Sequence, residues 1–295
     1  MILTQTLPAD DSGAPGRWRS AAPGLLIVLF TLAAYLPAMK AGYVWDDPDY
    51  VTENELLRSL DGLGRIWVPG NTPQYYPLVF TTFWIEYHLW ELQPLGYHLT
   101  NILLHALSAV MVWRVLLRLR IPAAWLCATV FALHPVHVES VAWITERKNV
   151  LAVLFYLLSL RAYLGFVDHR RAGLYFAALA LFGAALLSKT VTSSLPVVLL
   201  LIIWYRGGRF GAADLLNLLP FFIVGLCLSL LTVWLERHHV GARGVDWELS
   251  LPQRVLIAGR ALWFYVATLL WPTRLTFIYP RWEPDPTRLV EWLAP

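Results

Sequence analysis

Apolar runs close to the length of a membrane-spanning helix constrain this chain more than any other feature. Crossing the hydrocarbon core of a bilayer takes about 20 apolar residues in helical conformation. With 58% hydrophobic and 15% charged residues among 295, the composition excludes a soluble globular domain. We therefore expect an all-α polytopic membrane protein with seven or eight spans, several of them short. The runs cover residues 23–39, 97–117, 123–144, 149–167, 172–188, 190–205, 215–235 and 253–272.

Basic residues occur at every second connection between these runs, as they do when helices cross a membrane alternately. Lys and Arg are retained on the cytoplasmic side, so we expect a disordered cytoplasmic tail at 1–22 and a membrane domain at 23–272. The acidic loop at 40–96 then lies on the exterior face, and the side of the C-terminal segment 273–295 stays open. The basic clusters are Arg17 and Arg19; Arg114, Arg118 and Arg120; His169, Arg170 and Arg171; and Arg206 and Arg209.

The exterior loop at 40–96 has structure of its own. Residues 53–68 repeat apolar side chains at helical spacing, which predicts a short helix on the membrane surface. Residues 78–92 form an aromatic-rich amphipathic stretch of the kind found at membrane interfaces. A connection of this length with its own helices is usually functional.

Asp46 and Asp47 open this loop, directly after the first apolar run. Ionised groups near lipid are costly, which favours a functional role. Two adjacent carboxylates repel each other and raise one pKa, as a general base requires. We favour Asp47 as the base and Asp46 as its partner, although the reverse order is almost as well supported. The structural alternative is that the pair and Asp49 cap a surface helix.

The third apolar run contains a proline and several polar side chains. Pro135 breaks the helical hydrogen-bond ladder, and His134, His137 and Glu139 cluster around the break. These three side chains are candidates for substrate contact. Polar packing across the bundle is an equally good explanation for the histidines. A metal site is a weaker alternative, because the spacing around Pro135 is uneven.

Three cations are expected on the exterior side, where basic residues are otherwise rare. Arg147 and Lys148 follow the third run, and Lys189 lies between the fifth and sixth runs. A phosphate would explain cations in these positions. The alternative is that their long side chains extend to the interface while their stems pack against apolar surface.

Four motifs resemble those of the transmembrane, tetratricopeptide-repeat-containing O-mannosyltransferases and their bacterial relatives, polytopic glycosyltransferases of the GT-C superfamily. The likeness covers roughly residues 23–282, with the motifs in the same order. They are Tyr-Val-Trp-Asp-Asp at 43–47, Tyr-Tyr-Pro-Leu at 75–78, Gly-Tyr-His-Leu-Thr-Asn at 96–101 and His-Pro-Val-His-Val-Glu-Ser-Val-Ala-Trp at 134–143.

The resemblance implies a reaction. A sugar, mannose or a similar hexose, would pass from a polyprenyl-phosphate carrier to an acceptor hydroxyl, often on Ser or Thr of a protein, on the exterior face. The transfer would be inverting, with an acidic residue of the first loop as base and Tyr76 among the substrate contacts. No cofactor is expected; a divalent metal on Asp46 and Asp47 is possible chemically but not favoured.

The expected partners are the lipid-linked donor, a protein or glycan acceptor and the bilayer, here the inner membrane of a bacterium. The net charge of +3 is distributed as topology determinants, which gives no support for nucleic-acid binding. Two departures from the family keep alternatives open: no repeat of about 34 residues is visible, and no acidic residue follows Lys189. An inactive transferase fragment, or a transporter or flippase of lipid-linked sugars, is the second hypothesis. A single broken span at Pro135 without a counterpart counts against transport.

Overall fold

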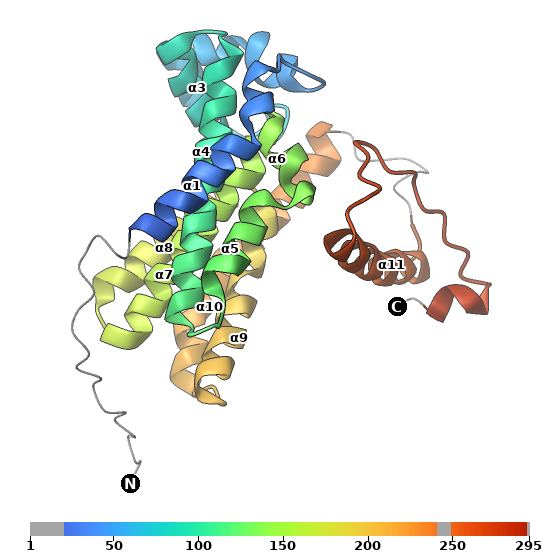
Figure 1. Cartoon of the computed structure of the whole chain (residues 1–295). Helices are drawn as coiled ribbons and strands as arrows, with labels where there is room; N and C mark the ends of the chain where they lie inside the picture. Colours follow the sequence, from blue (N-terminus) through green and yellow to red (C-terminus); the bar gives the residue numbers. More distant parts are fainter. Residues whose placement is uncertain (1–20, 241–248, 294–295) are drawn as a thin grey trace.

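The computed structural model describes residues 21–240 and 249–293. Of these described residues, 77% are helical and none lies in a strand. Each predicted apolar run contains at least one α-helix, and the all-α prediction is confirmed (Figure 1). The predicted tail at 1–22 lies almost wholly outside the described residues. The α-helices are α1 (Ala22–Ala34), α2 (Leu60–Ile66), α3 (Pro77–Trp90), α4 (Pro94–Arg118), α5 (Ala124–Leu133), α6 (Val138–Ala142), α7 (Arg147–His169), α8 (Ala172–Ser188), α9 (Leu195–Gly207), α10 (Ala212–Leu235) and α11 (Leu251–Leu270).

Short 3-10 or π turns join or extend these helices. They are η1 (Leu36–Lys40), η2 (Pro48–Thr52), η3 (Glu55–Arg58), η4 (Pro135–His137), η5 (Thr190–Ser194), η6 (Glu236–Val240) and η7 (Leu289–Leu293).

Four helical segments in the described part are long and apolar enough to cross a membrane. Three shorter apolar helices, α1, α5 and α8, accompany them. The eighth predicted run forms α11, which is not among these apolar helices and lies crosswise beside the bundle in Figure 1. The four long segments are Pro94–Arg118, Arg147–His169, Thr190–Gly207 and Ala212–His239.

The bundle has two packed halves, which meet where α4 packs against α7. In one half, α1, α4 and α5 approach closely through Ala109, Ala128 and Ala132, all fully or almost fully buried. Small residues allow such close approach of membrane helices. In the other half, α7 packs along α8, and Phe182 and Phe221 join α8 to α10 with ring centroids 5.4 Å apart.

One end of the bundle is fixed by an ion cluster. Asp168, near the end of α7, pairs with Arg118 at 2.8 Å and with Arg206 at 2.9 Å. Because these residues lie near the C-terminal ends of α7, α4 and α9, those ends meet at one end of the bundle. The alternation of basic connections predicted this arrangement.

The loop at 40–96 forms a cap at the opposite end, around α3 (Figure 1). Its core contains Leu57, Ile66 and Phe80, all fully buried, and Tyr50 stacked on Phe80. The single helix predicted over 53–68 is wrong, because the chain divides there into η3 and α2. Ser59 causes the division: its hydroxyl accepts from the Gly62 N–H at 3.0 Å and caps α2.

The predicted break at Pro135 is present. Helix α5 ends at Leu133, and His134 takes the extended conformation that a following proline favours. Its ring accepts from the Val136 N–H and starts η4. The break turns the chain so that α6 and the residues before α7 lie near the loop cap.

Candidate functional site

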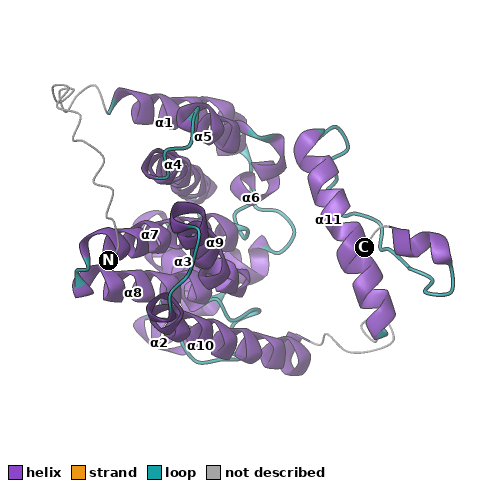
Figure 2. Ribbon diagram, turned by 90° about the horizontal axis from the view of Figure 1, so that it is seen from below, coloured by secondary structure: helices purple, strands orange, loops and turns teal. Residues whose placement is uncertain are grey.

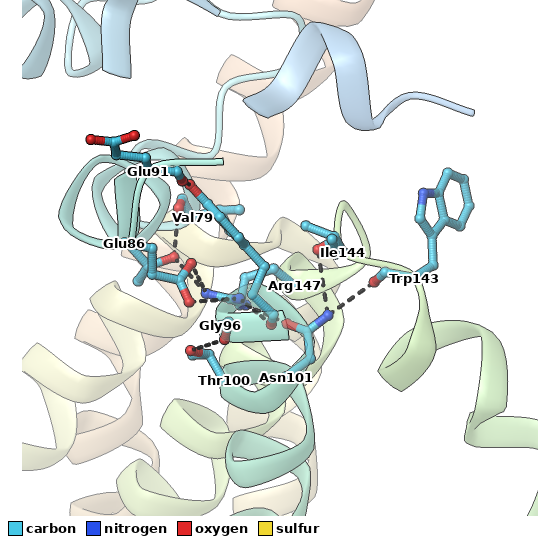
Figure 3. A network of polar contacts seen from close by, with 11 residues as sticks. Val79, Glu86, Glu91, Gly96, Thr100, Asn101, Trp143, Ile144 and Arg147 are labelled. Carbon is cyan, nitrogen blue, oxygen red and sulfur yellow. Dashed lines mark hydrogen bonds and ion pairs between the residues drawn. The ribbon is translucent and has the colours of Figure 1, made fainter. Parts of the chain in front are cut away.

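Arg147 is the largest fully buried side chain of the described residues, and it is completely paired. Its two terminal nitrogens contact the Glu86 carboxylate at 2.8 and 3.1 Å, Thr82 Oγ1 at 3.2 Å and the Tyr97 carbonyl at 3.0 Å. Its Nε–H donates to Asn101 Oδ1. All five N–H donors of the guanidinium are therefore in use (Figure 3).

This pairing changes the interpretation of Arg147. A phosphate could bind it only by displacing one or more of these partners, and displacing Glu86 would break a buried ion pair at a cost of about 3–5 kcal/mol. The predicted phosphate contact is therefore not supported, and Arg147 instead links α3, α4 and α7. Asn101 extends the link by donating to the carbonyl oxygens of Trp143 and Ile144 (Figure 3).

Asp47 is also fully buried. Its Oδ1 accepts from the Thr145 N–H at 2.9 Å and the Thr145 hydroxyl at 2.6 Å, and its Oδ2 accepts from the Val44 N–H at 2.8 Å. Both oxygens are thus engaged in joining the first loop to the turn before α7. This geometry suits a positioning group better than a base that must reach an acceptor.

Asp46 differs from its neighbour in exposure and bonding. Its side chain is partly exposed, and none of the described residues makes a side-chain hydrogen bond to its carboxylate. Burial raises its pKa above the ordinary value; Lys148 lowers it, while Asp49, Asp47 and Glu146 raise it. A reachable carboxylate with a raised pKa has the properties of a general base.

A polar cluster lies beside Asp46. Glu146 pairs with Lys148 at 2.8 Å and more loosely with Lys189 at 3.9 Å. Lys189 donates to Asn149 Oδ1 at 2.6 Å, and Asn149 donates to Ser140 Oγ at 2.9 Å and to Glu146. Two of the three predicted phosphate-binding cations thus converge on one carboxylate.

Four members of this arrangement were missed from the sequence: Ser140, Thr145, Glu146 and Asn149. The argument that made Asp46 and Asp47 candidates, an ionised group close to lipid, applies equally to Glu146. Thr145 carried no such indication, because its role depends on the distant Asp47.

Aromatic rings surround the lysine end of the cluster. The Lys148 ammonium lies 5.5 Å from the Tyr50 ring centroid and 5.9 Å from that of Trp143. Cation–π contacts of this length help to hold an ammonium group that is only partly paired.

The residues around the Pro135 break have different main partners, although the His134 and His137 ring centroids lie 6.4 Å apart. His134 uses both ring nitrogens, one toward Val136 and the other at 2.9 Å from the Leu269 carbonyl of α11. The His137 ring packs on Phe131, with centroids 4.6 Å apart. Glu139 lies in the electrostatic field of the lysine cluster. Within the described ranges, no three His, Cys, Asp or Glu side chains are grouped so that they could hold a metal ion.

Tyr76 is buried at the start of α3, outside this group. Burial raises its pKa to about 12. It lines a small recess with Gln74 and Glu236. Gln74 accepts from the Tyr50 hydroxyl and donates to Glu236, so this part of the loop cap is joined to the end of α10.

A cavity of about 240 Å³ adjoins the lysine cluster. Its polar lining includes Lys189, Asn149 and His137, while Val153 and Val191 are exposed on the flank of the bundle. A cavity with a charged inner end and an apolar opening suits an amphiphile. The full lining is His105, Ser108, Phe131, His137, Ser140, Asn149, Val150, Ala152, Val153, Lys189, Val191 and Thr192.

Comparison with known proteins places this arrangement in context. The chain is similar to Protein O-mannosyl-transferase TMTC4 of Homo sapiens, with 33% identity over 55% of this chain and 24% of the relative. It is 30% identical to Protein O-mannosyl-transferase F38B6.6 of Caenorhabditis elegans, over 46% of this chain and 22% of the relative. It is 33% identical to Protein O-mannosyl-transferase Tmtc1 of Drosophila melanogaster, over 52% of this chain and 19% of the relative.

The alignments thus span about a quarter or less of these curated relatives. No protein-family model matches the chain, and no solved structure matches it. The resemblance noticed in the four motifs is confirmed: the curated homologues are protein O-mannosyltransferases.

Proposed function

We propose that this chain is a membrane glycosyltransferase that moves mannose, or a similar hexose, from a polyprenyl-phosphate carrier to a Ser or Thr hydroxyl of a protein. The observation that carries the proposal is the reachable Asp46 carboxylate beside the Glu146–Lys148–Lys189 cluster. A base and phosphate-binding cations close together are what an inverting transfer from a lipid phosphate requires. The names of the relatives, protein O-mannosyl-transferases, supply mannose and protein as the expected sugar and acceptor.

The chemistry divides between the two aspartates. Asp46 removes the proton of the acceptor hydroxyl as that oxygen attacks the anomeric carbon. The bond from this carbon to the phosphate oxygen breaks, and the polyprenyl phosphate leaves with the bonding electrons. Asp47 holds the loop through Thr145 and Val44 and so positions Asp46.

The lysines are assigned to the donor. Lys189 lines the cavity, where its ammonium would meet the phosphate, and Lys148 would stabilise the same charge as it grows. His137 and Ser140, in the same lining region, are suited to contact the sugar or the phosphate. The apolar opening beside Val153 would admit the prenyl chain from the bilayer.

The proposed orientation places the loop cap on the exterior face. The Arg118–Asp168–Arg206 cluster would then lie at the cytoplasmic end, as basic residues near spans do. In a bacterium, this would be the inner membrane with the site facing the periplasm.

The test is transfer from radiolabelled polyprenyl-phosphate mannose by the full chain in nanodiscs. Asp46→Asn is expected to abolish transfer while retaining donor binding. Asp61→Asn, an exposed carboxylate in the same loop, is the matched control and should retain transfer. Equal activity in Asp46→Asn and the wild type would exclude Asp46 as the base. Donor movement across the bilayer without transfer would favour the transporter hypothesis.

A further inference from the structure

The segment after α11 places Phe277 between two tryptophans at the candidate site. Its ring centroid lies 4.9 Å from that of Trp143 and 5.5 Å from that of Trp45. Residues 271–280 have no helix or strand, and Figure 2 shows α11 apart from the bundle. The contact therefore brings a non-helical piece of polypeptide from a peripheral part of the chain to the two tryptophans.

Both tryptophans adjoin groups assigned to the chemistry. Trp45 directly precedes Asp46, and the Trp143 ring lies 5.9 Å from the Lys148 ammonium. Anything held between the two rings is consequently close to the proposed base and to the proposed phosphate site.

The exposure and the backbone conformation of Trp45 are both unusual for a residue without function. The residue is 65% exposed, and its φ of 52° is in the left-handed region, which residues other than glycine rarely adopt. Strained backbone of this kind occurs where a side chain must be aimed at a ligand. The Trp143 Nε1–H is buried and meets no acceptor within the described part of the chain, so it is available as a donor.

We infer that Trp45 and Trp143 form a subsite for an aromatic side chain of the acceptor polypeptide, next to the Ser or Thr that receives the sugar, and that Phe277 occupies this subsite in the structure. The inference rests on the proposed function and adds a preference in the acceptor sequence. Aromatic rings pair favourably in tilted and edge-to-face arrangements, and both Phe277 contacts are of this kind.

Two properties of the Phe277 segment, its sequence and its weak attachment, support a peptide as the ligand of this subsite. Thr276, a hydroxyl residue, directly precedes Phe277, and its own hydrogen bonds go to Ile278 and Tyr279 within the segment. Phe277 remains 47% exposed between the tryptophans. A half-exposed ring on a segment bonded mainly to itself can be displaced by an incoming peptide of the same kind.

The experiment uses the full chain in nanodiscs and a fluorescent peptide with the sequence of residues 274–280, Arg-Leu-Thr-Phe-Ile-Tyr-Pro, without donor. Anisotropy measures binding. Phe277→Ala removes the tethered competitor, whose effective concentration is high, and should tighten peptide binding by about tenfold. Replacing the peptide's Phe by Ala should remove most of that affinity.

Trp45→Ala should weaken binding of the Phe peptide, and because Trp45 is exposed this change leaves the packed core intact. Trp263→Ala, an exposed tryptophan of α11, is the matched control and should bind like the wild type. The inference is overturned if Phe277→Ala leaves affinity unchanged, or if the Ala peptide binds as well as the Phe peptide. Since binding is read without donor, failure of transfer would affect the proposed function alone. Equal transfer to both peptides would overturn only the aromatic subsite.

Discussion

The Asp47 carboxylate accepts both the backbone N–H and the hydroxyl of Thr145, at 2.9 and 2.6 Å, across 98 positions of sequence. This double contact fastens the first loop to the turn before α7. Asp46 is the chain neighbour of Asp47, and Glu146 is the chain neighbour of Thr145. One buried interaction therefore fixes the spacing between the proposed base and the carboxylate that gathers the lysines.

The first prediction separates the two aspartates by what each substitution damages. Asp47→Asn loses a charged acceptor for three donors, and an unsatisfied buried group costs about 1–3 kcal/mol. We expect a lower melting temperature as well as reduced transfer. Asp46→Asn should abolish transfer with the melting temperature unchanged. Thermal unfolding in detergent, followed beside the transfer assay, checks both; a stable Asp47→Asn protein would refute the positioning role.

The second prediction concerns the buried Arg147–Glu86 pair. Arg147→Met leaves Glu86 charged and unpaired, which should cost about 3–5 kcal/mol. The double variant Arg147→Met, Glu86→Leu should recover much of that loss, because it removes both charges.

Stability of the two variants against thermal unfolding is the measurement. Arg65→Met, at an exposed position of α2, serves as the control and should change stability by no more than about 0.5 kcal/mol. If Arg147 bound donor phosphate instead, the double variant would regain stability but lose donor affinity.

The third prediction is a pH dependence of transfer. The base must be ionised, and burial raises the pKa of Asp46 above its ordinary value. Transfer should therefore decline as the pH falls through that raised pKa, at a higher pH than for an unperturbed aspartate. Lys148→Gln removes the cation that lowers this pKa, so the acid limb should move to still higher pH. Lys40→Gln, at an exposed position of η1 just after the first helix, is the control and should leave the pH profile of transfer unchanged.

Most of the fold could be predicted from the sequence, because the period and length of apolar runs are local properties. The break at Pro135 followed from one residue for the same reason. The division of residues 53–68 was missed, because apolar periodicity does not register a cap such as that of Ser59 on the Gly62 N–H. The turn also brings Gly62 so close to Leu56 that a Cβ there would meet the Leu56 carbonyl oxygen at 2.1 Å, and this local contact has no counterpart in helical periodicity.

The sequence pointed to several residues of the candidate site but not to the contacts that each of them makes. Local sequence identified Asp46, Asp47, Arg147 and Lys148 as unusual charges. It did not show which of these charged side chains would pair with residues distant in the sequence. Glu86 lies 61 positions from Arg147, and that distance in sequence is why this ion pair could not be foreseen.

The last prediction concerns the cavity beside Lys189. Lys189→Gln removes a charge-assisted bond to phosphate, worth about 1.5–3 kcal/mol, and should weaken binding of polyprenyl-phosphate mannose by about 10- to 150-fold. Val153→Trp should weaken it by narrowing the opening, whereas Leu126→Trp, at an exposed position of α5, should not. Binding of labelled donor to nanodiscs distinguishes these variants. Because Lys189 donates to Asn149 at 2.6 Å, Asn149→Ala should leave Lys189 less firmly positioned and cause a smaller loss of donor affinity. Unchanged donor affinity in both Lys189→Gln and Val153→Trp would place the donor elsewhere.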